Sequence, residues 1–122
     1  MSRSHLLGAA LLVVIAAVVL WWWSGRPTVY EGAATVTLTD SRFEPKELHI
    51  RVGTAVTFKT TRPNQFWPAS NLHPEHSMYP EFDPKEPIAS GDSWTLTFTR
   101  EGIWGYHDHL RSYFTGVIYV EE

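Results

Sequence analysis

Cysteine is absent from this sequence, and its absence excludes several kinds of site at once. Without a thiol the chain has no disulfide bond, no cysteine nucleophile, no zinc site that uses cysteine and no iron–sulfur cluster. A bound metal ion would have to be held by histidine, carboxylate, methionine or backbone oxygen. The fold must be stabilised by its own core, which a content of 43% hydrophobic and 14% aromatic residues makes feasible.

Blocks of like charge are absent as well. The chain of 122 residues has 10 lysines and arginines against 13 aspartates and glutamates, a formal net charge of -3. This balance, without a basic cluster, predicts no nucleic acid partner. No G-x-S-x-G motif and no phosphate-binding glycine loop occurs, so we predict no catalytic nucleophile. The length fits one small domain better than two.

Charge is missing altogether from the stretch Leu6 to Trp23. As a helix this stretch reaches about 27 Å, close to the roughly 30 Å hydrocarbon thickness of a bilayer. Three tryptophans close it, as in an interfacial aromatic belt, and Arg3 before it favours a cytoplasmic N-terminus. Signal cleavage after Ser24 or Gly25 would place a tryptophan where a small residue is needed, so an uncleaved anchor is favoured over a signal sequence. Either segment places the domain outside the cytoplasm, in the periplasm or at the cell surface.

We predict a membrane anchor over residues 1–25, a tether over 26–34 and a folded domain over 35–122. The domain contains segments in which apolar and polar residues alternate, separated by turn signals such as SGDS and REG. They are residues 35–40, 47–52, 54–60, 93–99, 102–107 and 115–121. The pattern predicts an all-β fold, an antiparallel sandwich of six to eight strands.

Residues 62–87 interrupt the alternation and contain six of the eight prolines. A connection this long in a compact domain is usually functional or disordered, and its aromatic residues argue against disorder. It contains His73 and His76. The segment therefore predicts a functional loop.

Four of the six histidines form two close pairs, His73-x-x-His76 in this loop and His107-x-His109 at the end of a strand. In a strand His107 and His109 share one face, and Asp108 points the opposite way. Four imidazoles without thiolate suit copper, zinc or nickel. Strand-end loops gather at one pole of a sandwich, so the pairs can meet and hold one metal ion. Two histidines receive no metal role: His5 and His49.

Four further residues are expected around the histidines. Asp108 could accept the second N–H of an imidazole. Trp67 and Tyr106 are expected to pack in the core or at its rim, with an aromatic fence that limits access of water to a metal as the alternative. Met78 is expected to be a packed side chain, with a soft ligand for Cu(I) as the alternative. The acids of the loop are expected to be solvated or to cap turns, with a carboxylate ligand as the alternative: Glu75, Glu81 and Asp83.

The stretch FEPKELHIRVGTAVTFKTT, from Phe43, has the F-x-P-x-x-L-x-I-x-x-G-x-x-V-x-F pattern of cupredoxins, and EGIWGYHDHLRSYFTGVIYVEE resembles their last hairpin. The resemblance covers most of residues 35–122 and implies a cupredoxin-like Greek-key β-sandwich. The family's usual Cys, His and Met positions are taken here by Asp108, Arg111 and Phe114, and Trp67 falls near the usual upstream His. A blue copper centre needs the thiolate, so the usual electron-transfer site is excluded.

The stretch WGYHDHLRSYFTGVIYV is also similar to multicopper oxidase domains, which have W-x-H-x-H before a short loop and a Gly-containing last strand. In those domains the two histidines bind copper in a site shared between domains. Only His107 and His109 match that motif, and His73 and His76 lack the second H-x-H. The resemblance implies copper, and a complete trinuclear cluster would need association of subunits.

These observations favour a membrane-anchored, extracytoplasmic, cupredoxin-like copper-binding protein for copper handling or redox work, with a redox or copper-transfer protein as its partner. Oxidase-type activity would need an open coordination position and a substrate pocket. One alternative is a metal-free scaffold that acts as a binding or assembly module. Another is a zinc-binding variant, since four histidines satisfy the tetrahedral preference of zinc. Formation of a homo-oligomer stays open.

Overall fold

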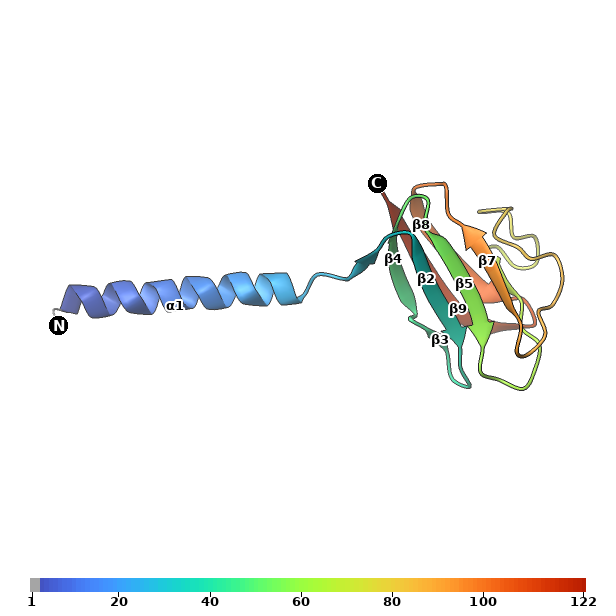
Figure 1. Cartoon of the computed structure of the whole chain (residues 1–122), viewed down its shortest axis with the longest axis horizontal. Coiled ribbons are helices and arrows are strands. Elements are labelled where there is room, and N and C mark those ends of the chain that lie inside the picture. The colour runs from blue at the N-terminus through green and yellow to red at the C-terminus, as the bar shows by residue number, and fades with distance from the viewer. Residues whose placement is uncertain (1–2) are drawn as a thin grey trace.

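The computed structural model describes residues 3–122 as one helix followed by a two-sheet sandwich (Figure 1). Helix α1, Arg3–Ser24, projects away from the sandwich, and none of its residues is buried. It is long and apolar enough to cross a membrane, as expected from the uncharged stretch. An apolar helix with no protein surface against it suits a bilayer or a signal sequence. The first two residues of the predicted anchor lie outside the described residues.

Within residues 3–122, nine strands form the two sheets. The order is β1-β4-β9-β8-β6 in the five-stranded sheet and β3-β2-β5-β7 in the four-stranded sheet. The bounds are β1 Val29–Tyr30, β2 Ala33–Leu38, β3 Phe43–Glu44, β4 Glu47–Arg51, β5 Ala55–Thr60, β6 Pro68–Ser70, β7 Ser93–Thr97, β8 Gly102–Asp108 and β9 Arg111–Glu121.

Each of the six predicted segments contains most of a strand, because one face of each segment packs against the core and produces the alternation. Strand β9 begins at Arg111, earlier than the predicted start at residue 115. The three strands that were not predicted, β1, β3 and β6, are two or three residues long, too short for alternation to be recognised. Strand β1 lies inside the predicted tether and pairs with β4.

The prediction of an antiparallel sandwich is wrong for three strand pairs. Strands β1 and β4, β2 and β5, and β4 and β9 pair in parallel. The reason is that the chain crosses between the sheets: β2 and β5 are neighbours in one sheet, while β4, which lies between them in sequence, belongs to the other. Parallel neighbours require such crossings, and a Greek-key sandwich supplies them.

The core between the sheets is strongly aromatic. The Tyr106 ring lies 4.8 Å from Phe43, 5.6 Å from Phe58 and 5.2 Å from Phe82, measured between ring centroids. Gly116 is opposite Tyr106 on β9, and the tyrosine ring fills the space that a side chain at residue 116 would need. Tyr106 is fully buried, which confirms the expectation of core packing. The alternative role beside the histidines is wrong, because alternation along β8 places Tyr106 on the face opposite to His107.

The irregular segment between β6 and β7 is anchored by aromatic side chains rather than disordered. Tyr79 is 1% exposed and Phe82 0% exposed. Its first residue, Asn71, donates its backbone N–H to the Gly105 carbonyl, and the Asn71 side chain lies directly over Gly105. The segment therefore lies over the outer face of β8. As a result, the two loop histidines lie near the end of that strand.

Candidate metal centre

Four histidines meet at the end of β8. One ring nitrogen of each lies within 4.8 Å of those of the other three: His73, His76, His107 and His109. The last two come from β8 and the turn that follows it, and the first two come from the loop after β6. The structure thus brings together all four residues that the sequence singled out as ligands. His49 lies outside this cluster and stacks on Tyr119, with ring centroids 4.3 Å apart.

Two contacts between rings identify the nitrogens that face one another. His73 Nδ1 lies 3.1 Å from His107 Nε2, and His76 Nε2 lies 2.9 Å from His109 Nδ1. Two ligand atoms that are each about 2.0–2.1 Å from one ion lie roughly 2.8–3.4 Å apart. Both separations fit that range, so the four imidazoles form a donor set that one metal ion could share.

The remaining ring nitrogen of each buried histidine has an oxygen partner. His76 Nδ1 lies 2.8 Å from Asp83 Oδ2, and His107 Nδ1 lies 2.9 Å from Asn71 Oδ1. An oxygen at this position accepts the N–H, which fixes the tautomer and leaves Nε2 free to bind a metal. Asp83 was expected to be solvated or to cap a turn, with a ligand as the alternative. It does cap a turn, through the Lys85 N–H, but its contact with His76 was not predicted, and Asn71 was missed. Nothing local in the sequence marks Asn71, because its role depends on where the loop crosses β8.

Asp83 is held in its charged form by a set of donors. Burial raises its pKa, but hydrogen bonds from His76, Trp67 and Lys85 outweigh burial and hold the pKa of Asp83 well below its usual range. The Trp67 indole N–H donates to Asp83 Oδ1 at 2.9 Å, and the Lys85 backbone N–H donates to the same oxygen at 2.8 Å. A carboxylate that stays ionised remains an acceptor for the His76 N–H.

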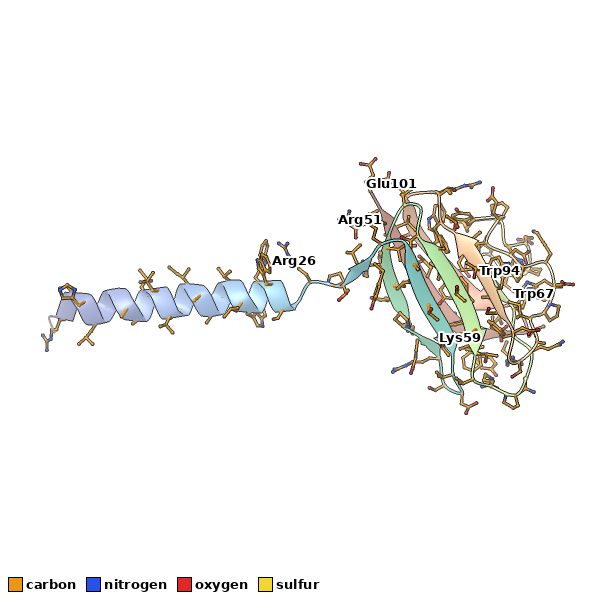
Figure 2. All side chains as sticks on the ribbon, in the orientation of Figure 1. Arg26, Arg51, Lys59, Trp67, Trp94 and Glu101 are labelled. Atoms are coloured by element: carbon orange, nitrogen blue, oxygen red, sulfur yellow. The ribbon has the colours of Figure 1, made fainter. Side chains whose placement is uncertain are left out.

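Trp67 lies beside the histidines. Its ring centroid is 4.6 Å from that of His109, and its indole N–H is used by Asp83, so it packs against one histidine and supports the partner of another. Figure 2 shows Trp67 at the end of the sandwich remote from α1. The cluster therefore lies at the far end of the domain from the helix.

Asp108 does not orient a histidine. It is fully buried, and its Oδ1 accepts backbone N–H groups of Trp67 at 2.8 Å and Leu110 at 3.4 Å. Its Oδ2 lies 3.1 Å from Arg111 Nε, an ion pair that lacks hydrogen-bond alignment. Burial raises the pKa of Asp108, and the two N–H groups and Arg111 offset part of this effect. Alternation along β8 turns Asp108 away from His107, which is why the predicted contact does not form.

The residues that the resemblance assigned to the family's usual ligand positions contact other groups. Asp108 and Arg111 form the buried ion pair, and the Trp67 backbone N–H donates to Asp108. Phe114 packs against the Arg62 guanidinium, which lies 5.2 Å from the centre of its ring.

Met78 was expected to be packed, but its side chain is 55% exposed. Its backbone N–H donates to the Asn71 carbonyl at 2.8 Å, which fixes the backbone while the side chain reaches solvent. Two of the loop acids are exposed as expected: Glu75 and Glu81.

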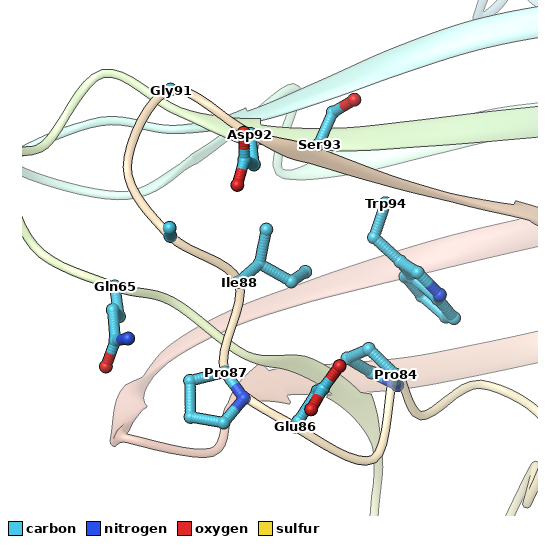
Figure 3. A pocket seen from close by; sticks show the side chains of 10 residues that line it. Gln65, Pro84, Glu86, Pro87, Ile88, Gly91, Asp92, Ser93 and Trp94 are labelled. Atoms are coloured by element: carbon cyan, nitrogen blue, oxygen red, sulfur yellow. The ribbon is translucent and has the colours of Figure 1, made fainter.

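A hollow beside β7 is lined by side chains other than the four histidines (Figure 3). It has a volume of about 700 Å³ and is lined by Gln65 and by residues between Pro84 and Trp94, with no histidine among them. The four histidines of the candidate metal centre therefore do not line this hollow.

Proton binding at the cluster predicts how stability depends on pH. Burial first, and then the neighbouring histidines, lower the pKa of His107 to about 4 from 6.5. The unfolded chain therefore binds a proton at this residue between those values while the folded chain does not, so the metal-free protein should lose stability as pH falls from 6.5 towards 4. Above pH 6.5 this contribution is constant. Urea unfolding followed by tryptophan fluorescence from pH 7.5 to 4.5 measures it.

The matched control is His49, a histidine of β4 outside the cluster. His107→Gln should reduce the dependence of unfolding free energy on pH, and the part that remains is assigned to His109, whose pKa burial and the neighbouring histidines also lower. His49→Gln should keep the full dependence. An unchanged slope in His107→Gln would show that the acid sensitivity arises elsewhere.

Comparison with known proteins identifies the family. The sequence pattern of the Cupredoxin-like domain matches residues 12–120. Amicyanin of Paracoccus denitrificans is 30% identical over 94 residues, covering 76% of this chain and 69% of amicyanin. Among solved structures, a reduced amicyanin variant superposes with a TM-score of 0.62 at 22% identity, covering 74% of this chain and 83% of that one. A copper-containing nitrite reductase of Thermus scotoductus gives 0.62 at 25% identity, covering 80% of this chain and 24% of that one.

The two-sheet sandwich, the pattern from Phe43 and these similarities agree with one another. The chain departs from the family's usual site in having no cysteine. On these grounds the chain belongs to the cupredoxin family.

Proposed function

We propose that this chain is a membrane-anchored, extracytoplasmic copper-binding protein that holds one copper ion without thiolate. The main support is that four imidazoles converge, with ring nitrogens within 4.8 Å of one another. In addition, Asp83 and Asn71 orient the two buried rings. The proposed ligands are His73, His76, His107 and His109. The function is copper handling, as storage or delivery, or redox work at the same ion.

Copper is favoured over zinc by the family and by chemistry. The nitrite reductase that shares the fold is a copper-containing protein, and copper(II) binds nitrogen ligands more tightly than the other divalent first-row ions do. Zinc remains the second candidate, because four histidines match its tetrahedral preference. When bound, copper would supply one-electron redox capacity, while the histidines bind it and the oriented pair of rings fixes its position.

Helix α1 supports the proposed membrane anchor. Its most apolar 18-residue window has a mean hydropathy of 2.5, and no part of that window is buried by the domain. Three tryptophans end the helix, where an interfacial aromatic belt would lie. An uncleaved helix would keep the copper-binding domain at the outer surface of the membrane.

Metal content and electron paramagnetic resonance test the proposal. The full chain in detergent micelles is loaded with one equivalent each of copper and zinc and then freed of excess metal. One retained copper with nitrogen hyperfine structure and no intense blue band is expected. Retention of zinc in place of copper would make the protein a zinc-binding variant. Loss of both metals at neutral pH would leave a metal-free scaffold.

The support given by Asp83 can be measured separately. Asp83→Asn should lower the copper affinity by about 10-fold to 100-fold, the usual effect of removing a group that orients a metal-bound imidazole. Copper competition titrations measure the change. The matched control is Asp92→Asn, which alters an exposed acid of the same connection and should leave the affinity unchanged. Equal affinities in the two variants would contradict the role given to Asp83.

A further inference from the structure

The four histidines are not held equally. His76 is 4% exposed and His107 is 2% exposed, and each has an oxygen partner on its second nitrogen. His109 is partly exposed, but its ring packs on Trp67, and its backbone N–H donates to the Trp67 carbonyl at 2.7 Å. Three of the rings are therefore positioned by groups outside the cluster.

His73 is the exception. It is exposed, and among residues 3–122 its ring packs on two other aromatic rings, those of His107 at a centroid distance of 5.0 Å and of His109 at 4.8 Å. Within residues 3–122, its second ring nitrogen has no hydrogen-bond partner. Its chain neighbours Leu72 and Pro74 are exposed too. In the described part of the chain, no hydrogen bond or ring contact from outside the cluster holds the His73 ring.

A ring fixed by its surroundings loses little conformational freedom when it binds a metal, so it stays bound or rebinds quickly. A ring that is free in the absence of metal must lose its rotamer freedom each time it binds, and this cost weakens its bond relative to those of the others. The difference between His73 and the other three therefore predicts an order of release from a bound ion. His73 also stands on the solvent side, where an incoming ligand can reach.

We infer that His73 is the exchangeable ligand of the site and that copper leaves when an acceptor's nitrogen or sulfur donor takes its place. In this step the bond from copper to His73 Nδ1 breaks and a bond from copper to the acceptor donor forms, with no electron transferred. His76, His107 and His109 hold the ion until further acceptor donors replace them. The inference rests on the proposed copper function and assigns delivery as the use of the site.

Transfer kinetics test the inference. The full chain in detergent micelles is loaded with one equivalent of Cu(II) and mixed with excess chelating tripeptide Gly-Gly-His, and the absorbance of the peptide complex is followed. In the unaltered protein the rate should rise with peptide concentration, because the acceptor takes part in the displacement. His73→Ala should keep one copper and transfer it about tenfold faster or more, the change that about 1.36 kcal/mol of barrier produces.

Free imidazole provides a further readout. Added to copper-loaded His73→Ala, it should occupy the released position, slow the transfer and restore the original paramagnetic spectrum. His49→Ala, which changes a histidine outside the cluster, should transfer copper at the original rate. Circular dichroism checks that His73→Ala is folded, which its exposed position favours.

Two results would overturn the inference: transfer from His73→Ala at the original rate, or loss of copper from it as complete as from His107→Ala. Both can be recognised only if the unaltered protein binds copper through nitrogen. Failure of the unaltered protein to hold copper would instead remove the proposed function, and the inference with it. The two failures are thereby distinguished.

Discussion

His107→Ala is expected to abolish stoichiometric copper binding. The imidazole of His107 is 2% exposed, presents Nε2 to the Nδ1 of His73, and is fixed through Nδ1 by Asn71. Alanine removes a positioned donor from the centre of the cluster. The neighbouring Asp108 cannot replace it, because its carboxylate accepts the backbone N–H groups of Trp67 and Leu110. Metal analysis after gel filtration of the full chain with one equivalent of copper gives the result.

The control for this prediction is His49→Ala, which should bind one copper as the unaltered chain does. His49 stacks on Tyr119 on the outer face of the five-stranded sheet and takes no part in the cluster. Unfolding by urea shows whether His107→Ala still folds, so that lost binding is not mistaken for lost structure. Equal loss of copper in both variants would contradict the assignment of the ligands.

Arg111→Met should lower the free energy of unfolding by about 3 kcal/mol, because it leaves the buried Asp108 carboxylate without its nearest counter-charge and with only the weaker influence of Arg62. Asp108 is fully buried, and the Arg111 Nε lies 3.1 Å from its Oδ2. Methionine keeps much of the aliphatic length of arginine, so the loss reports charge more than packing. The two backbone N–H groups on Oδ1 remain and limit the cost. Urea unfolding at pH 7 measures it.

The comparison is Arg42→Met. Arg42 pairs with Glu44 at 3.1 Å, but the two side chains are 65% and 47% exposed, so the loss should be below about 1 kcal/mol. The pH dependence separates the two cases. Burial raises the pKa of Asp108, and removal of Arg111 raises it further, so in acid the carboxyl becomes neutral and the cost of Arg111→Met should shrink. Equal losses in the two variants at pH 7 would show that the buried pair does not stabilise the fold.

Strand positions could be predicted where a strand has one buried face, as in β4, where Leu48 and Ile50 are buried and the residues between and beside them are more exposed. The parallel pairing of β4 with β9 could not be predicted from the sequence. It joins segments far apart in the chain and depends on the crossing of the chain between the two sheets. Pairing partners are a property of the whole chain, whereas alternation is local.

The candidate site shows the same division. The spacing of His107 and His109 predicts a shared face, and that alternation also turns Asp108 away, so the role suggested for Asp108 conflicted with its own strand position. The groups that do orient the rings, Asn71 and Asp83, reach them through the path of the loop over β8. The spacing of the histidines in the sequence indicated the metal ligands. It could not indicate Asn71 and Asp83, the residues that orient them.

The short connection between helix and sandwich restricts where the domain can go. Helix α1 ends at Ser24 and β1 begins at Val29, so even a fully extended link spans at most about 18 Å. With α1 in a bilayer, the histidine cluster at the remote end of the domain faces the aqueous compartment yet cannot diffuse into it. An acceptor anchored in the same bilayer would meet it by lateral diffusion, at a higher effective concentration than a freely dissolved one. Exchange of copper then becomes an encounter in two dimensions.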